Sequence, residues 1–253
     1  MSSADKGASN SWLYLVFLCL MFYKPSVQSA EMDWSLYNEL LQQYVSAGQV
    51  EGVTLNLVGY SKLSKDPRFS QLLEQLQRFP LDNLNTKEEN ISFYINAYNI
   101  LAIQMVIKHW PLASIKDVGS WWQPVWKKEA GSLGGSTVSL DQIEHEVLRK
   151  LQEPRIHFAI ACASLSCPDL RKEAYTADLL VEQLNSQARI FLKNKSKGLS
   201  RNSDEIVVSK IFDWFAEDFS AEGGVQAFIN QYSEVKTSEI KGYLPYNWQV
   251  NGI

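Results

Sequence analysis

The fold is decided by residues 87–109, which read KEENISFYINAYNILAIQMVIKH. Thr86 and Glu89 precede the apolar run with the spacing of a capping box, which predicts that a helix begins there. The run ends before Pro111, which cannot continue a helix. Because its residues are apolar almost all round, we expect this helix to lie in the interior of the protein.

Four polar residues interrupt this apolar helix. Glu89, Ser92, Asn96 and Asn99 recur at intervals of three, four and three residues and so form one stripe. An unpaired buried polar group costs about 1–3 kcal/mol, so the stripe must face partners, water or a ligand. One interpretation is a hydrogen-bond network to neighbouring backbone. The other is the wall of a functional pocket, with Glu89 and Asn96 as catalytic candidates and Asn99 as a ligand-binding candidate.

The rest of the chain predicts more helix than strand. Apolar spacing and capping signals predict helices over 33–47, 66–79, 140–151, 176–193, 211–219 and 222–232. Shorter runs predict strands over 53–57, 155–162 and 205–209, and a loop or hairpin at 131–135. Few and scattered strands favour one helix-rich α+β domain with a small sheet over residues 31–253.

The first thirty residues resemble a secretory leader. Residues 12–23 are apolar without interruption, with Lys6 before them and Lys24 after them. This run is shorter than the ~20 apolar residues that a membrane span needs, and it suits a signal peptide. We expect cleavage near residue 30, a periplasmic or secreted domain, and no membrane contact afterwards. The alternative is an uncleaved membrane anchor.

Composition limits the kind of partner. The chain has 24 Lys and Arg against 28 Asp and Glu, a net charge of −4, and the charges are interspersed. Without a basic stripe, nucleic acid is not an expected partner. We expect a small-molecule or peptide ligand instead, and no pattern in the sequence indicates a cofactor.

Two histidines are candidate catalytic bases. On its predicted strand, His157 shares a face with Ala159 and Ala161, whose small side chains leave room for a ligand. A core histidine with satisfied hydrogen bonds is the alternative. His145 follows Asp141 by one helical turn, so that carboxylate could orient the ring, as at many general bases. Asp141 is therefore a ligand-binding candidate, although such pairs are common on helix surfaces.

Three roles compete for Cys162 and Cys167. In an oxidising compartment, a disulfide is the first expectation for two cysteines so close in sequence. A free, activated Cys167 beside a histidine would instead be a catalytic nucleophile. The third role is metal ligation with His145 or His157, or thiol–disulfide chemistry. The C-x4-C spacing is looser than that of the usual redox or zinc motifs.

Several segments form specific motifs: ENISFYINAYN at 89–99, SLDQIEH at 139–145, PRIHFAIACASLSCP at 154–168, KIFDWF at 210–215 and YLPY at 243–246. In these motifs the chain strongly resembles the family called domain of unknown function 547. The resemblance covers nearly all of the chain after the leader. At these positions the chain does not depart from the family pattern. It implies an exported, bacterial-type protein without an assigned activity.

A buried helix with polar groups beside a histidine strand is similar to the core of papain-like and transglutaminase-like enzymes. In those enzymes the nucleophilic cysteine lies near the helix start, where this chain has asparagines. We predict a hydrolase-like or binding protein with a His/Asn/Glu pocket for a peptide-like or small polar ligand. The alternatives are a thiol–disulfide or metal site at Cys162 and Cys167, and a non-catalytic interaction module.

Overall fold

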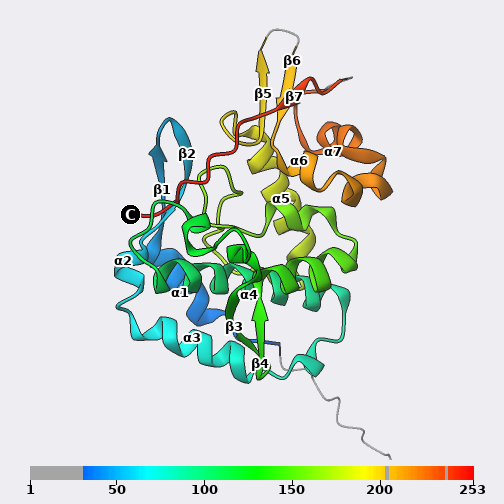
Figure 1. The fold of residues 1–253 in the computed structure, drawn as a ribbon. Helices are drawn as coiled ribbons and strands as arrows, with labels where there is room; N and C mark the ends of the chain where they lie inside the picture. Colours follow the sequence, from blue (N-terminus) through cyan, green and yellow to red (C-terminus); the bar gives the residue numbers. More distant parts are fainter. Residues whose placement is uncertain (1–30, 203–204, 237–238) are drawn as a thin grey trace, which may run out of the picture.

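The structure is a computed structural model that describes residues 31–202, 205–236 and 239–253. The predicted signal peptide, residues 1–30, lies outside the described residues. Helix α4 (Lys87–Lys108) runs through the middle of the molecule (Figure 1). Thr86 Oγ1 accepts a hydrogen bond from the Glu89 backbone N–H (3.1 Å), and Glu89 Oε2 accepts one from the Thr86 N–H (2.9 Å). The predicted capping box is therefore confirmed.

Three helices precede α4 and pack around it: α1 (Ser35–Tyr44), α2 (Tyr60–Leu63) and α3 (Pro67–Arg78). Helix α3 begins as predicted, with Pro67 in its first turn and Asp66 Oδ1 accepting from the Arg68 N–H (2.9 Å). A short 3-10 helix, η1 (Leu81–Asn83), joins α3 to α4. Helix α1 contacts α3, and α2 contacts α4.

The helix predicted over 33–47 ends earlier, at Tyr44. Strands β1 (Val45–Val50) and β2 (Val53–Val58) follow as an antiparallel hairpin. Gly48, the residue after the predicted helix, lies within β1, where an added Cβ would come 2.4 Å from Leu57 Cδ1. A larger residue at this position would displace the Leu57 side chain on the paired strand. The strand predicted over 53–57 is confirmed.

A second hairpin packs against α3 and α4. It consists of β3 (Glu129–Leu133) and β4 (Ser136–Ser139), which are antiparallel. Gly134 and Gly135 form the turn, both with positive φ (54° and 83°), a conformation that favours glycine. The predicted hairpin is thus confirmed. Two 3-10 helices, η2 (Ile115–Val118) and η3 (Val125–Lys127), lie between α4 and this hairpin in the chain.

The helix predicted over 140–151 is present in an unusual form. Ser139 and Gln142 cap its start reciprocally. The Ser139 N–H donates to Gln142 Oε1 (2.9 Å), and the Gln142 N–H donates to Ser139 Oγ (3.1 Å). Its first part, η4 (Gln142–Leu148), is a π-helix, and a 3-10 turn, η5 (Arg149–Leu151), completes it. π-helical turns are rare and often occur at functional sites.

The strand predicted over 155–162 is wrong. Residues 154–158 form a 3-10 helix, η6 (Pro154–Phe158), with proline at its start and Glu153 Oε1 accepting from the Arg155 N–H (3.1 Å). This proline and cap favour a helix start, whereas a short apolar run cannot by itself distinguish strand from helix. The chain then has no regular element until α5 (Leu180–Lys193), which begins four residues later than the predicted position 176.

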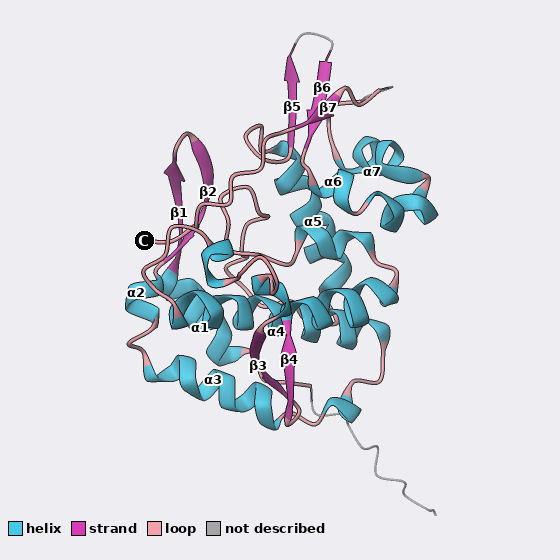
Figure 2. Ribbon diagram, in the orientation of Figure 1, coloured by secondary structure: helices cyan, strands magenta, loops and turns pink. Residues whose placement is uncertain are grey.

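The C-terminal part combines a small sheet with short helices (Figure 2). Strand β6 (Glu205–Val208) pairs antiparallel with β5 (Leu199–Asn202) and parallel with β7 (Gly242–Tyr243), which confirms the strand predicted there. The helices predicted over 211–219 and 222–232 are present as α6 (Ile211–Trp214), η7 (Ala216–Glu222) and α7 (Gly224–Tyr232). No helix in the described ranges is long and apolar enough to span a membrane.

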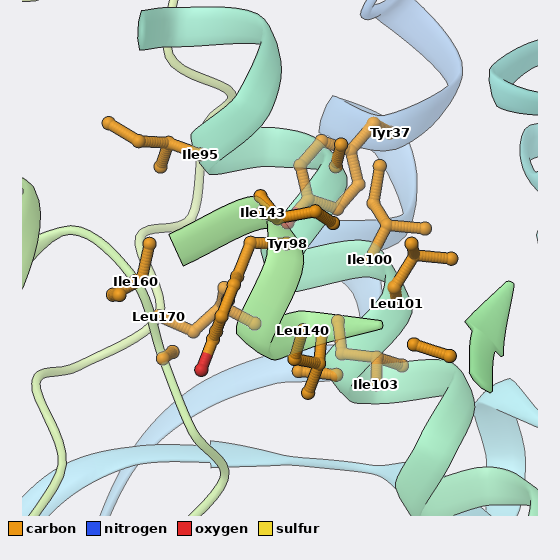
Figure 3. Packing of buried hydrophobic residues seen from close by; sticks show 14 of the residues in the cluster. Tyr37, Ile95, Tyr98, Ile100, Leu101, Ile103, Leu140, Ile143, Ile160 and Leu170 are labelled. Atoms are coloured by element: carbon orange, nitrogen blue, oxygen red, sulfur yellow. The ribbon is translucent and has the colours of Figure 1, made fainter. Parts of the chain in front are cut away.

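Two hydrophobic clusters form the core. The larger surrounds α4, and Figure 3 shows Tyr98 of this helix among Ile143, Ile160 and Leu170. The smaller is rich in phenylalanine and includes Phe158, Phe191, Phe212, Phe219 and Phe228. Helices predominate over small separate sheets, so the α+β fold class is confirmed. A papain-like or transglutaminase-like core stays a prediction.

Candidate functional site

A cavity of about 290 Å³ lies where the two hydrophobic clusters meet. Tyr98 and Ile160 reach it from the larger cluster, and Ile211 and Phe215 from the smaller. Its polar wall is formed by Asp141, Glu144, His145, His157, Cys162 and Cys167. Carboxyl, imidazole and thiol groups therefore converge on one hollow with a largely apolar lining, as is typical of small-ligand sites.

Cys162 and Cys167 are both free thiols, so the predicted disulfide is wrong. Each sulfur has its own hydrogen-bond partners instead. Cys167 Sγ accepts from the Cys162 backbone N–H (2.7 Å). Cys162 Sγ lies 3.4 Å from both Ser164 Oγ and the Tyr246 hydroxyl oxygen. Cys162 is partly exposed, whereas Cys167 is buried.

The surroundings change the acidity of the two thiols in opposite directions. Burial raises the pKa of Cys162, but hydrogen bonds with Cys167, Ser164 and Tyr246 outweigh burial and lower that pKa to about 7. Burial and the neighbouring Cys162 raise the pKa of Cys167 above its ordinary range. Because the thiolate is the nucleophilic form of cysteine, we expect Cys162 to be the more reactive thiol at neutral pH.

The loop that carries Cys162 is held from two sides. Asn99 on α4 donates to the Ala159 carbonyl (3.0 Å) and accepts from the Ala161 N–H (2.7 Å). On the other side, the C-terminal tail pairs with the loop, with the Asn251 N–H donating to the Ala163 carbonyl (3.0 Å). Ala163 has a φ of 62°, a left-handed conformation that is uncommon for alanine. Packing and hydrogen bonds on both sides compensate for this local strain.

Glu144 places a protonated carboxyl group near the thiol. Burial raises the pKa of Glu144 to about 8, and the charge of Cys162 adds to the rise, while Arg149 opposes it. The Tyr98 hydroxyl hydrogen bonds with Glu144, and burial raises the pKa of Tyr98 well above its ordinary value. Glu144 is therefore mostly protonated at neutral pH and can donate a proton into the cavity.

The two histidines are linked through one carboxylate and one guanidinium. His157 Nε2 lies 2.7 Å from Asp218 Oδ2, and Arg149 donates to both Asp218 oxygens (2.7 Å each). Arg149 Nη1 also contacts His145 Nδ1 (3.0 Å). Burial lowers the pKa of His157 and of His145, although Asp218 and Asp141 oppose this. Both rings are therefore predominantly neutral near pH 7.

The expectation of an open face beside His157 is wrong. Its side chain is 2% exposed, and its ring stacks on Phe215 with a centroid distance of 4.1 Å. In η6 the alternation of a strand no longer applies, so Ala159 and Ala161 do not share a face with the ring. His157 nevertheless lines the cavity.

The structure brings together five of the predicted site residues and separates three. Asp141, His145, His157, Cys162 and Cys167 line the cavity, and Asp141 Oδ1 lies 3.8 Å from His145 Nε2. The polar stripe of α4 lies outside it. Glu89 caps the helix, Asn96 exchanges hydrogen bonds with the Tyr175 backbone (2.8 and 2.9 Å), and Asn99 holds the Cys162 loop.

Sequence reasoning missed Glu144, Arg149, Asp218 and Tyr246. Glu144 could have been found, because it directly precedes His145 in a quoted motif and π-helical geometry turns both toward the cavity. Tyr246 lies in the YLPY motif, whose position gives no hint of a contact with Cys162. Asp218 follows His157 by 61 residues, and no local pattern connects the two.

The remaining wall of the cavity is aromatic. Tyr246 and Trp248 lie 4.4 Å apart between ring centroids, and Trp214 and Trp126 contact Trp248 at 5.7 and 6.0 Å. Among the described residues, no group of three His, Cys, Asp or Glu side chains has an arrangement that could hold a metal ion. The reactive groups at this cavity are the thiols of Cys162 and Cys167, the carboxyls of Asp141 and Glu144, and the imidazoles of His145 and His157.

No curated protein and no solved structure matches the chain. Residues 81–192 match the family described as "Protein of unknown function, DUF547". This segment includes α4, the π-helix with Glu144 and His145, and the loop with Cys162 and Cys167. Tyr246 completes the cavity from outside this segment, and Asp218, which contacts the cavity residue His157, also lies outside it. This match supports membership of the chain in the DUF547 family.

Proposed function

We propose that this protein is a thiol-dependent acyl-transfer enzyme of the hydrolase type, with Cys162 as its nucleophile. One observation carries the proposal. A partly exposed thiol with a lowered pKa opens into a cavity in which a carboxyl group, Glu144, keeps its proton at neutral pH. Covalent catalysis of acyl transfer requires a nucleophile and a proton donor whose pKa values lie near neutral pH. The surroundings of Cys162 and Glu144 shift both pKa values in that direction.

In the first half of the proposed reaction, Cys162 Sγ attacks the carbonyl carbon of an ester, thioester or amide. A carbon–sulfur bond forms and the bond to the leaving group breaks. The proton of Glu144 moves to the leaving group, which departs neutral. The products of this half are an acyl thioester on Cys162 and a Glu144 carboxylate.

In the second half, the Glu144 carboxylate removes a proton from a water molecule as that water attacks the thioester carbon. The carbon–sulfur bond breaks, and the acyl group leaves as a carboxylic acid. Cys162 returns to the thiolate and Glu144 to its protonated form, so the cycle closes without any other reactant.

The cavity supports a small polar or peptide-like substrate. Its volume of about 290 Å³ lies at the lower end of ligand pockets. We assign His145 and Asp141, at the cavity wall, to hydrogen bonds with polar groups of the substrate. The Arg149–Asp218–His157 group positions this wall. The apolar run 12–23 supports a location in the periplasm or outside the cell.

Thiol–disulfide exchange is the second candidate function, and the position of Cys167 favours it. The thiols of Cys162 and Cys167 hydrogen bond with each other and have opposite pKa shifts, as in pairs of an attacking and a resolving cysteine. Cys162 would attack a substrate disulfide, and Cys167 would then displace the substrate thiol and form the Cys162–Cys167 bond. A dithiol reductant would regenerate the pair.

Trapping the acyl-enzyme tests the first proposal. The full chain is mixed with p-nitrophenyl acetate at neutral pH, and peptide mapping by mass spectrometry locates any acetyl group. We expect acetylation of Cys162, loss of turnover in Cys162→Ser, and accumulation of acyl-enzyme in Glu144→Gln because deacylation lacks its base.

Cys167→Ser is the matched variant that separates the two functions. Acyl transfer does not use the second thiol, so this variant should keep esterase turnover within a few-fold. If instead the ester leaves Cys162 unmodified, while a disulfide substrate is reduced by the wild type and not by Cys167→Ser, thiol–disulfide exchange is the function. If Cys162 reacts with neither substrate class, both proposals fail.

A further inference from the structure

Trp121 and Trp122 are 86% and 81% exposed, the highest values for large apolar side chains within the described residues. Their rings contact each other edge to face with centroids 4.7 Å apart. Both belong to the loop between η2 and η3, and neither lines the cavity. Exposure of two adjacent tryptophans has an energetic cost in water, so this pair marks an interaction surface.

The loop holds the two rings outward because its base is closed. The Ser120 N–H donates to the Gln123 carbonyl (2.9 Å), and the Gln123 N–H donates to Ser120 Oγ (3.2 Å). At Gly119 an added Cβ would lie 2.6 Å from the Val125 backbone nitrogen, so the two ends of the loop touch. Ile115 and Val125 anchor these ends in the core. The tryptophans are thus presented by a preformed structure.

Both ends of the loop also reach the rim of the cavity. On the incoming side, Lys116 Nζ lies 4.9 Å from the ring centroid of Trp248. On the outgoing side, Trp126 contacts Trp248 at 6.0 Å, and both of these tryptophans line the cavity. The loop that carries Trp121 and Trp122 is therefore joined to the aromatic wall of the cavity that Cys162 also lines.

The charges around the loop favour an anionic surface. Lys116, Lys127 and Lys128 flank the tryptophans, against the carboxylates of Asp117 and Glu129. The local excess is positive on a chain whose net charge is −4. Tryptophan is enriched at the level of lipid headgroups, where the ring is buried while its N–H stays hydrated, and nearby lysines are attracted to anionic lipids.

In place of the expectation of no membrane contact after cleavage of the leader, we propose that the Trp121–Trp122 loop docks the protein on the surface of a phospholipid bilayer. The occupant of this surface is lipid rather than a second copy of the chain, because a small apolar tip with lysines near it in the sequence fits the headgroup layer. One consequence rests on the proposed function. The cavity entrance would face the bilayer, and the substrate of Cys162 would be an acyl group carried by an amphiphile.

The binding test needs a local readout, because the apolar run 12–23 of the full chain can also bind lipid. Hydroxyl-radical footprinting with and without vesicles of phosphatidylcholine and phosphatidylglycerol provides one. We expect vesicles to protect Trp121 and Trp122 from oxidation and to leave Leu179 and Ile190, exposed residues on or beside α5, unprotected. Unchanged oxidation of both tryptophans would overturn the proposal. Protection that appears without vesicles and rises with protein concentration would instead identify a contact between copies and would also overturn it.

Paired variants extend the test. Trp121→Ser/Trp122→Ser should weaken retention on vesicles on the order of tenfold relative to a matched surface variant, Leu179→Ser/Val181→Ser, because apolar area buried in the bilayer is lost. Equal retention of the two variants would contradict docking through the loop. Cys162→Ser should bind vesicles like the wild type, so failure of the proposed enzyme activity and failure of membrane docking give different results.

A thiol-reactive lipid tests the consequence for the cavity. In vesicles that contain a maleimide headgroup lipid, Cys162 of the wild type should be labelled faster than Cys162 of Trp121→Ser/Trp122→Ser. Soluble maleimide should label the two proteins at the same rate. Equal labelling by the lipid would show that the cavity does not face the bilayer.

Discussion

Cys162 and Cys167 are separated by four residues, and their opposite acidity arises from what each sulfur contacts. Cys162 Sγ faces Ser164 and Tyr246, whose polar groups stabilise a thiolate, and the cavity gives it access to solvent. Cys167 has no comparable set of donors, and it lies buried against the Ile160 carbonyl (3.9 Å). Sequence spacing alone does not distinguish the two thiols, and the candidate nucleophile predicted from the sequence was Cys167.

The raised pKa of Glu144 makes the stability of the folded protein depend on pH. Its pKa is raised from the ordinary 4.5 to about 8, so between these pH values the folded protein binds a proton that the unfolded chain releases. Stability must therefore fall as pH rises through this window. Glu144→Gln removes this penalty while keeping the shape of the side chain. We expect the variant to be more stable than the wild type at pH 7.5 and equal to it near pH 4.5.

Thermal denaturation across this pH range measures the difference. Glu146→Gln, an exposed neighbour on the same helix, is the control and should show a constant difference from the wild type. A Glu144→Gln variant that is less stable at pH 7.5 than the wild type would mean that the carboxylate is the favoured form in the folded protein.

At the scale of elements, α4 connects the core to the reactive loop. Its two buried amides hydrogen bond with different segments. Asn96 binds the backbone of Tyr175, and Asn99 binds the backbone of Ala159 and Ala161. The structural interpretation of the polar stripe thus accounts for both amides, while Asn99 also determines where Cys162 lies.

This difference predicts distinct effects for two similar substitutions. Asn96→Ala and Asn99→Ala each leave buried backbone groups unpaired, and each should cost about 1–3 kcal/mol, or ~2–4 °C in Tm per kcal/mol at this chain length. Only Asn99→Ala should also slow alkylation of Cys162, because only it releases the loop. Equal reactivity in both variants would show that the tail alone positions the thiol.

The elements were predictable where local chemistry specifies them. The capping box at Thr86, the Asp66-Pro67 start of α3 and the Gly134-Gly135 turn are readable from a few adjacent residues. The segment 154–162 was not, because its apolar run fits strand and helix equally well. The candidate site was predictable only in part. Asp141, His145, His157 and Cys167 do meet at one cavity, but the contacts of Asp218 and Tyr246 join distant segments and leave no local signal.

At the scale of the whole molecule, Asp218 joins the two halves of the site. It lies on η7, packed on the phenylalanine cluster, and it holds Arg149 of η5 and His157 of η6. Burial raises the pKa of this carboxyl, but hydrogen bonds from Arg149 and His157 outweigh burial and hold it well below the ordinary 3.8. The resulting stabilisation is present above pH 3.8 and is lost as pH falls below it.

Asp218→Asn should therefore destabilise the protein at pH 7 by about 1.5–3 kcal/mol, the range for hydrogen bonds to charged groups. Urea unfolding measures this, and the difference from the wild type should shrink as pH falls below 3.8. Asp213→Asn, on the exposed side of α6, is the control and should have little effect. An equal loss for both variants would argue against a special role for Asp218.

The central claim is that Cys162 is an activated thiol, and the pH dependence of its alkylation tests this most directly. The native full chain is treated with iodoacetamide between pH 5 and 10, and peptide mapping gives separate rates for Cys162 and Cys167. We predict that the Cys162 rate rises with a midpoint near pH 7, that Ser164→Ala and Tyr246→Phe move this midpoint upward, and that Cys167 stays largely unmodified. A Cys162 midpoint at the ~8.5 of an ordinary thiol, or faster modification of Cys167, would contradict the account.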